Sequence, residues 1–330
     1  MSDLIHKLLL LAALPLCAQP TLYVCAGAPK EYVVGAKLPP SGLFRLPPGT
    51  PWEHRGYNLP FLFGLDYAAQ DPATIYLAAG NGLIRAEDGG SKWTLLTGSD
   101  VTELRDVSVD NNTPDTLYFA HSHGIRVSHD KGGTWREIGG TLHRKYTEAI
   151  RVDRQRAGVL LAGGEEGLFR TENGGETWKP AGAAGFQIMH IEQSPHDPCF
   201  WLATTQGGGI FASHNCGKSF ESAGNTGVDR NLYDVAFDPG DANRVAVAGY
   251  GPGVVVSEDA GKTWQPRNAG LPRPDAESLA FDPAKPGRLF AGVHEEGVFV
   301  SENAGRTWTK AGIDGSSAFR MKFIPERGAK

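Results

Sequence analysis

The chain has 330 residues, 40% of them hydrophobic, and a formal net charge of −5 at pH 7. This composition supports a packed core, and the lack of a long Lys or Arg run argues against a nucleic-acid partner. After residue 30 no apolar run is long enough to form a membrane-spanning helix, so we expect no membrane span.

The first 18 residues have the features of a secretory signal peptide. Lys7 precedes the apolar run LLLLAALPLCA over 8–18, which has the length of a signal h-region and is too short to cross a bilayer. We expect cleavage after Ala18 and export to the periplasm or the cell exterior. Cys17 suggests a lipoprotein, but Leu16 is larger than the residue that usually precedes a lipidated cysteine, so lipid anchoring is less favoured. An ordinary first helix is the remaining alternative.

From residue 21 onwards the sequence predicts short strands in groups of four. In 231–267, the runs NLYDVAFD, RVAVAGY, VVVSED and TWQPR predict four strands joined by turns rich in Gly, Pro, Asn and Asp. Equivalent groups span 62–98, 102–140, 146–182, 187–224 and 277–312. Four antiparallel strands in about 42 residues are typical of one blade of a β-propeller.

The two ends of the chain together supply a further blade. TLYVCAG (21–27), SGLFRLP (41–47) and TPWEHR (50–55) match second, third and fourth strands, and AFRMKFIPE (318–326) matches a first strand. We therefore predict an all-β, seven-bladed β-propeller with four antiparallel strands per blade. The C-terminal strand 318–326 pairs with the N-terminal strands within 21–55, and residues 19–330 form one domain. Such closure removes exposed sheet edges, and we expect a monomer.

One octad recurs at the turn between the third and fourth strands. Its copies are AEDGGSKW (86–93), SHDKGGTW (128–135), TENGGETW (171–178), SHNCGKSF (213–220), SEDAGKTW (257–264) and SENAGRTW (301–308), with a degraded copy RLPPGTPW (45–52). We expect the third position to accept backbone N–H groups of the turn, the glycine to adopt a positive φ and the aromatic residue to pack on the neighbouring blade. The third-position residues are Asp88, Asp130, Asn173, Asn215, Asp259 and Asn303. A ligand array is less favoured, because a motif in every blade serves what every blade needs.

These octads resemble the Asp-box, or BNR repeat, S-x-D-x-G-x-T-W. The longer stretch LLAGGEEGLFRTENGGETW (160–178) resembles WD40/YVTN/BNR-like propellers of sortilin-type receptors, Ycf48-like photosystem assembly factors and xyloglucanase-type glycoside hydrolases. The resemblance covers residues 20–326. It implies the Asp-box propeller fold but no single activity, because the same repeat occurs in sialidases, xyloglucanases, receptors and assembly factors.

The cysteines suggest one disulfide. Cys199 begins a second strand and Cys216 follows the adjacent third strand, so both lie at the same end of one blade. Two free buried thiols are the alternative. We expect Cys25 to be a free core thiol, and no Cys-x-x-Cys motif predicts a zinc site.

If the octads occupy one face, the opposite face is the candidate binding surface. Polar residues that enter the innermost strands or lie in the loops between second and third strands vary from blade to blade. As a binding rim we single out Arg105, Asp106, His190, Tyr233, Tyr250, His294, Glu295 and Arg320. The long loop APKEYVVGAKLPP (28–40) is a candidate lid or recognition loop, and a solvated rim of mixed charge is the alternative interpretation.

Acidic pairs across the channel would allow general acid–base catalysis of glycoside hydrolysis. The candidates are Glu148, Asp234 and Glu277, with Asp106 opposite Asp234 as another pair. His121 and His123 with His294 and Glu295 suggest a metal site only weakly, so we predict no metal and no cofactor. Phe44-Arg45-Leu46-Pro47 resembles a sialidase signature, but it lies within the degraded octad.

The sequence thus predicts an exported binding or assembly scaffold that engages a protein or glycan partner through the face opposite the octads. A secreted glycoside hydrolase, sialidase-like or xyloglucanase-like, is the alternative.

Overall fold

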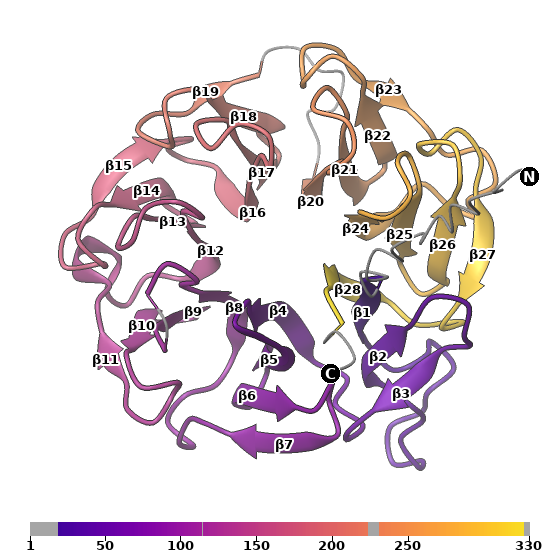
Figure 1. Ribbon diagram of the computed structural model, residues 1–330, viewed down its shortest axis with the longest axis horizontal. Coiled ribbons are helices and arrows are strands. Elements are labelled where there is room, and N and C mark those ends of the chain that lie inside the picture. The colour runs from indigo at the N-terminus through magenta and orange to yellow at the C-terminus, as the bar shows by residue number, and fades with distance from the viewer. Residues whose placement is uncertain (1–18, 114, 224–230, 327–330) are drawn as a thin grey trace, which may run out of the picture.

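The computed structural model describes residues 19–113, 115–223 and 231–326, so the predicted signal peptide lies outside the described residues. The described chain forms seven four-stranded antiparallel sheets arranged as blades around a central channel (Figure 1). The prediction of a seven-bladed β-propeller is therefore confirmed. In the described segments, no helix has the length and apolar character required to cross a membrane.

We number the blades by the position of their second strand in the chain and give the strands from the channel outwards. Blade 1 comprises β28 (Ala318–Ile324), β1 (Thr21–Ala26), β2 (Gly42–Leu46) and β3 (Glu53–Arg55). Blade 2 comprises β4 (Leu62–Ala68), β5 (Asp71–Ala79), β6 (Gly82–Glu87) and β7 (Lys92–Leu95). Blade 3 comprises β8 (Leu104–Val109), β9 (Leu117–His121), β10 (Gly124–Ser128) and β11 (Arg136–Glu137), and a short 3₁₀ turn, Gly140–Leu142, follows. Blade 4 comprises β12 (Thr147–Val152), β13 (Leu160–Gly164), β14 (Gly167–Thr171) and β15 (Lys179–Gly182).

The last three blades follow the same order. Blade 5 comprises β16 (Gln187–Gln193), β17 (Trp201–Gln206), β18 (Ile210–Ser213) and β19 (Glu221–Ser222). Blade 6 comprises β20 (Asn231–Phe237), β21 (Val245–Tyr250), β22 (Gly253–Ser257) and β23 (Gln265–Pro266). Blade 7 comprises β24 (Ala276–Phe281), β25 (Leu289–Val293), β26 (Gly297–Ser301) and β27 (Thr309–Gly312).

The ring closes where the two ends of the described chain meet. β28 pairs antiparallel with β1, with Thr21 opposite Ile324 and Cys25 opposite Arg320. Blade 1 in turn packs on blade 7 through a core that contains Val24 and Phe290. The closure model predicted from the sequence is confirmed.

The octads form hydrogen-bonded turns. In the octad at 257–264, the Ser257 hydroxyl donates to Asp259 Oδ1 at 2.8 Å and accepts the Gly261 N–H at 2.8 Å. Asp259 Oδ1 also accepts the Thr263 N–H at 2.8 Å. The same three contacts recur in the octads at 128–135, 171–178, 213–220 and 301–308. These turns therefore satisfy their own backbone groups, as predicted for a structural motif.

The octads other than the degraded copy also bond to the start of the second strand of their own blade. The fourth octad residue donates its N–H to a backbone carbonyl there, as in Ala260 to Asn243 at 2.8 Å and Lys131 to Asp115 at 2.9 Å. In blade 5 the equivalent residues are Cys216 and Cys199, and their side chains form a disulfide. Cys25 is a buried free thiol.

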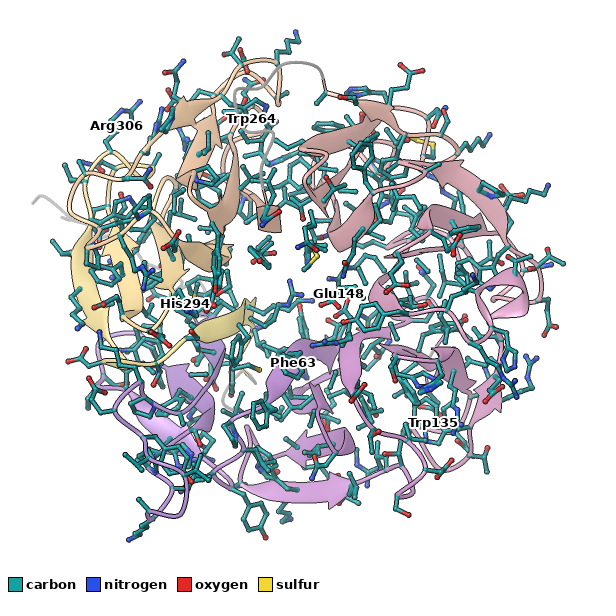
Figure 2. The ribbon with its side chains drawn as sticks, turned by 180° about the vertical axis from the view of Figure 1, so that it is seen from behind. Phe63, Trp135, Glu148, Trp264, His294 and Arg306 are labelled. Carbon is teal, nitrogen blue, oxygen red and sulfur yellow. A yellow bond between two sulfur atoms is a disulfide. The ribbon has the colours of Figure 1, made fainter. Side chains whose placement is uncertain are left out.

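Several octad tryptophans join neighbouring blades. The indole N–H of Trp135 donates to Leu96 O of blade 2, and that of Trp178 donates to Ile138 O of blade 3. Trp52 reaches Ala311 O of blade 7 at 2.7 Å, so the degraded octad keeps this function at the closing interface. Trp135 and Trp264 lie far from the channel in Figure 2, which places the octads around the outside of the ring.

Candidate functional site

The two faces of the ring differ in the segments that form them. The octads and the turns from first to second strands lie at one face, which we call the octad face. The loops from second to third strands and the segments that enter the innermost strands lie at the other face, which we call the loop face. Loop 28–40 belongs to the loop face, where Lys30 pairs with Glu296 at 2.8 Å.

Every innermost strand carries one irregularity at the same level of the channel. The register with the second strand skips a single residue near the loop face, which is the pattern of a β-bulge. The skipped residues are Phe63, Arg105, Glu148, Met189, Tyr233, Glu277 and Phe319. Phe63 and Glu148 lie beside the central opening in Figure 2. We call this set the bulge ring, and it surrounds the loop-face mouth of the channel.

One part of the bulge ring is an aromatic cluster with an ion pair. Phe63 and Phe319 have ring centroids 5.5 Å apart, and the Arg105 guanidinium lies 4.9 Å from the Phe63 centroid. Arg105 Nε is 3.6 Å from Glu148 Oε2, which also accepts a 2.5 Å hydrogen bond from the Tyr146 hydroxyl. Burial raises the pKa of Glu148, while Arg105 and Tyr146 act in the opposite direction.

The other charged part of the ring centres on Glu277. Its Oε1 accepts a 2.5 Å hydrogen bond from the Tyr250 hydroxyl and lies 2.7 Å from His294 Nδ1. Tyr250 also packs against the ring of Tyr233, with centroids 4.7 Å apart. Burial, together with Glu277, raises the pKa of Tyr250, so this tyrosine stays protonated and donates to the carboxylate. Both mouth glutamates are therefore held by a tyrosine.

Below the bulge ring, side chains from opposite blades block the channel. Arg320 Nη1 contacts Asp234 Oδ1 at 3.2 Å and forms a short contact with His190 Nδ1. His190 Nε2 lies 3.5 Å from Asp234 Oδ1 and 3.6 Å from Glu192 Oε2. Burial and the neighbouring Arg320 hold the pKa of His190 well below its usual value, so the ring is neutral. We call Arg320, His190 and Asp234 the channel plug.

The channel aspartates have a second set of partners in the backbone. Each innermost strand has a channel-side edge with no strand beside it, and at several of these edges side chains of the preceding blade bond to the backbone. Asp66 Oδ2 accepts the Val109 N–H at 2.8 Å, and Asp106 Oδ2 accepts the Ile150 N–H at 3.1 Å. Asp234 Oδ2 likewise accepts the Leu279 N–H at 2.8 Å. These carboxylates thus satisfy the backbone groups that a free sheet edge leaves unpaired.

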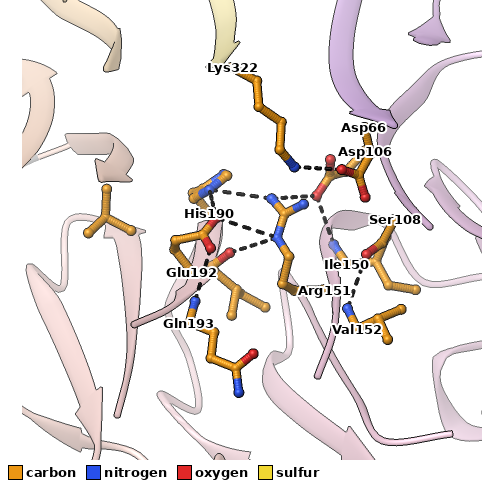
Figure 3. Close-up of polar contacts among 12 residues, drawn as sticks. Asp66, Asp106, Ser108, Ile150, Arg151, Val152, His190, Glu192, Gln193 and Lys322 are labelled. Carbon is orange, nitrogen blue, oxygen red and sulfur yellow. Dashed lines mark hydrogen bonds and ion pairs between the residues drawn. The ribbon is translucent and has the colours of Figure 1, made fainter. Parts of the chain in front are cut away.

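On the octad side of the plug the channel widens into a cavity of about 700 Å³. Figure 3 shows the polar side chains that converge there, with Arg151 between Glu192, His190 and Asp106, and Lys322 bonded to Asp66. Arg154 pairs with Glu192 and donates to Gln193 O. Although burial raises the pKa of Glu192, Arg154, His190 and Arg151 outweigh this effect and lower it.

The structure divides the predicted rim residues into two groups. Arg105, Tyr233, Tyr250, His294 and Glu295 lie at the loop-face mouth, as do Glu148 and Glu277. Asp106, His190 and Arg320 do not line the rim, because they lie inside the channel, where Asp106 is 1% and His190 3% exposed. Asp234 is likewise buried in the plug.

Several residues were not predicted from the sequence. Phe63, Met189 and Phe319 complete the bulge ring, and Arg151, Glu192 and Lys322 line the cavity. An alignment of the first strands would have placed Arg105, Glu148, Tyr233 and Glu277 at one equivalent position, although it would not have shown a bulge there. Pairing of Lys322 with Asp66 gives no such signal, since these residues are 256 positions apart.

The structure also bears on the weakly suggested metal site and on the sialidase-like signature. Within the described residues, no group of three or more His, Cys, Asp or Glu side chains could hold a metal ion. Arg45, in the sialidase-like signature, lies on β2 and pairs with Glu53 at 2.8 Å, away from the innermost strands.

Comparison with known proteins identifies the fold. No protein-family profile matches the chain, and no curated protein sequence matches it. Among solved structures, the GH74 enzyme of Niastella koreensis is 19% identical with a TM-score of 0.62, and the match covers 76% of this chain and 45% of that one. The GH74 xyloglucanase of Xanthomonas campestris is 17% identical with a TM-score of 0.63, with the same coverage. This chain therefore spans about half the length of these enzymes.

A third solved structure is YCF48 bound to D1 peptide. It is 18% identical with a TM-score of 0.57, and the match covers 77% of this chain and 86% of that one. At this level of identity, these similarities establish the β-propeller fold alone.

Proposed function

We propose that the protein is an exported binding or assembly scaffold that engages a protein or glycan partner through its loop face. The observation that carries this proposal is the location of exposed apolar side chains. Of the six large hydrophobic residues that are exposed in the described chain, five lie in segments of the loop face: Val33, Val34, Tyr57, Phe61 and Phe186. The sixth, Leu95, lies on the outermost strand of blade 2. Apolar side chains gathered on one face are typical of a surface that binds a partner.

The loop-face mouth of the channel also offers side chains that could bind a partner. Half-buried aromatic rings such as Phe63 and Tyr233 provide area for stacking against a sugar face or an apolar side chain. Loop 28–40 extends this surface at the closing blade, with Val34 91% exposed. The fold similarity to YCF48 bound to D1 peptide is consistent with a propeller that holds a peptide.

We further propose that the chain is exported and that its octads are Asp-boxes. The apolar run after Lys7 supports export, as does the Cys199–Cys216 disulfide, because disulfides persist in oxidising compartments. The repeated Ser–Asp–Gly–Thr hydrogen bonds support the second assignment, since they give these recurring octad positions a defined role in the turn.

A secreted glycoside hydrolase, xyloglucanase-like or sialidase-like, is the second candidate. The observation that favours it is Glu148, whose raised pKa suits a general acid, on the opposite side of the bulge ring from Glu277. Against it, both carboxylates are already hydrogen-bonded to tyrosines. Fold similarity to GH74 enzymes supports it only at the level of the scaffold.

One set of assays separates the two proposals. We expect residues 19–330 to release no product from aryl glycosides, sialosides or xyloglucan. Turnover that disappears in Glu148→Gln or Glu277→Gln, while the fold is kept, would establish the hydrolase instead. For the scaffold, we expect Phe61→Ser and Phe186→Ser to abolish capture of a partner that the wild-type protein retains. Lys218→Ser, which changes an exposed side chain of the octad face, should leave capture intact.

A further inference from the structure

The cavity on the octad side of the channel is separate from the loop-face surface. It lies between the plug and the ends of the innermost strands that lead into the octad-face turns, and its lining includes Ser108, Gln193, Phe237 and Phe281. The Arg320–His190–Asp234 contacts lie between it and the bulge ring. Its volume of about 700 Å³ falls within the range of small-molecule sites, about 300–1,000 Å³.

The charged groups around this cavity are unequally exposed. The Arg154 side chain is 48% exposed and that of Lys322 is 33% exposed. Their acidic partners lie deeper, with Glu192 19% and Asp66 9% exposed. A ligand that enters from the octad face therefore meets cations before it meets carboxylates.

The acidic side chains around the cavity also accept hydrogen bonds from backbone N–H groups. Asp66 accepts the Val109 N–H, Asp106 accepts the Ile150 N–H, and Glu192 accepts the Gln193 N–H at 3.2 Å. These bonds hold at least one oxygen of each carboxylate on the backbone. The cations bond to the same acids, Lys322 to Asp66 and Arg154 to Glu192, and Lys322 and Arg151 extend toward the same space in Figure 3. Cations arranged in this way suit a carboxylate or another small anion.

Another part of the wall is apolar. Phe237, Phe281 and Phe323, at equivalent positions of three consecutive innermost strands, line the cavity together with proline residues of the following turns. A ligand that fills the space must therefore combine an anionic group with an apolar face.

We propose that this cavity is a binding site for a small organic carboxylate, held through its anionic group by Lys322 and Arg154 with its apolar face against the phenylalanine wall. This site is independent of the proposed function, because it shares no residue with the loop-face surface.

Isothermal titration at fixed ionic strength tests the site with benzoate and glucuronate. Benzamide and glucose serve as uncharged counterparts, and inorganic phosphate as an anion without an apolar face. We expect one of the two carboxylates to bind with one-to-one stoichiometry, and at least about tenfold more tightly than its uncharged counterpart and than phosphate. Failure of both carboxylates to bind the wild-type protein and the Asp66→Asn variant would overturn the proposal.

Variants separate binding from folding. Lys322→Met should weaken binding by about tenfold or more, whereas Lys145→Met, which removes a loop-face lysine paired with Glu166, should not change it. Asp66→Asn should tighten binding, because it frees Lys322 while the amide oxygen still accepts the Val109 N–H. The double variant Asp66→Asn with Lys322→Met leaves no unpaired charge and should fold, yet bind no better than Lys322→Met. Equal affinity of wild-type and Lys322→Met protein for the carboxylate would overturn the assignment. The proposed loop-face function is tested separately, by partner capture with the Phe61 and Phe186 variants.

Discussion

At the scale of single residues, two consecutive octad positions adopt a positive φ, but only the second is always glycine. In the octad at 257–264, φ is 59° at Ala260 and 86° at Gly261. The octad at 171–178 has glycine at both positions, with φ of 66° at Gly174 and 93° at Gly175. A side chain has room at Gly174, whereas Gly175 lies against Ile138 of the preceding blade.

This difference predicts unequal effects of the same substitution. A Cβ at Gly174 would meet nothing closer than Tyr118 Oη at 3.7 Å, so Gly174→Ala should lower the free energy of unfolding by only about 1 kcal/mol of backbone strain. A Cβ at Gly175 would lie 2.4 Å from Ile138 Cδ1, so Gly175→Ala should add roughly 1–3 kcal/mol of overpacking. Urea denaturation of the two variants measures this, and equal losses would contradict the proposed contact.

His121 should make stability depend on pH. It is 4% exposed in β9, and burial, together with Arg126 and His123, lowers its pKa to about 4. Since the unfolded histidine has a pKa near 6.5, the neutral form stabilises the folded state fully above pH 6.5. This contribution is lost as the pH falls toward 4, by up to roughly 3 kcal/mol.

The comparison with His121→Gln isolates this effect. Between pH 7 and pH 4 the free energy of unfolding of the wild-type protein should fall more steeply than that of the variant, because other titrating groups contribute equally to both. Chemical denaturation at a series of pH values provides the measurement. Parallel pH profiles would show that His121 does not titrate in this range.

At the scale of elements, the channel-side edges of several innermost strands are bonded by side chains of the preceding blade. Ser108 Oγ of β8 accepts the buried Val152 N–H of β12 at 3.1 Å. Ser108→Ala should therefore cost about 1–3 kcal/mol, because it leaves a buried donor unpaired. Ser91→Ala, which removes an exposed hydroxyl bonded only to Asp88 O, should change the free energy of unfolding by less than about 0.5 kcal/mol. Thermal denaturation of both variants tests this, and equal losses would refute the edge-bonding role.

The sequence predicted the elements well, because each blade repeats a local pattern. Short apolar runs located the strands, and the octad glycines located the turns between third and fourth strands. The β-bulge at Glu148 or Glu277 could not be predicted, since an extra residue in one strand becomes visible only when its partner strand is paired with it. Tyr250 was expected on the rim, but its bond to Glu277 and the bond from Tyr146 to Glu148 were not predicted.

At the scale of the whole molecule, the sequence indicated the ring but not the contacts across its channel. His190 and Arg320 were expected on the rim because both enter innermost strands from the loop face. In the structure they contact each other inside the channel, beside Asp234, although 130 positions separate them in the chain. Such contacts depend on how seven blades close, so a pattern that is local to each blade does not predict them. Closure thus creates both the plug and the cavity behind it.

Closure of the ring depends on β28. Removal of residues 316–330 deletes β28, so blade 1 loses its innermost strand, the β1 edge is exposed and blade 7 loses the packing surface that includes Met321. The same deletion removes Arg320 and Lys322, and Asp234 and Asp66 then lose their cationic partners.

We expect the truncated chain to lose its cooperative thermal transition and to become sensitive to proteolysis, because a propeller with an open seam exposes a hydrophobic strand edge. A control that removes only 327–330 keeps β28 and should melt like the full chain. If the 316–330 deletion melted within about two degrees of that control, the ring would not need its last strand. A difference of about two degrees in melting temperature corresponds to a loss of less than about 1 kcal/mol in the free energy of unfolding.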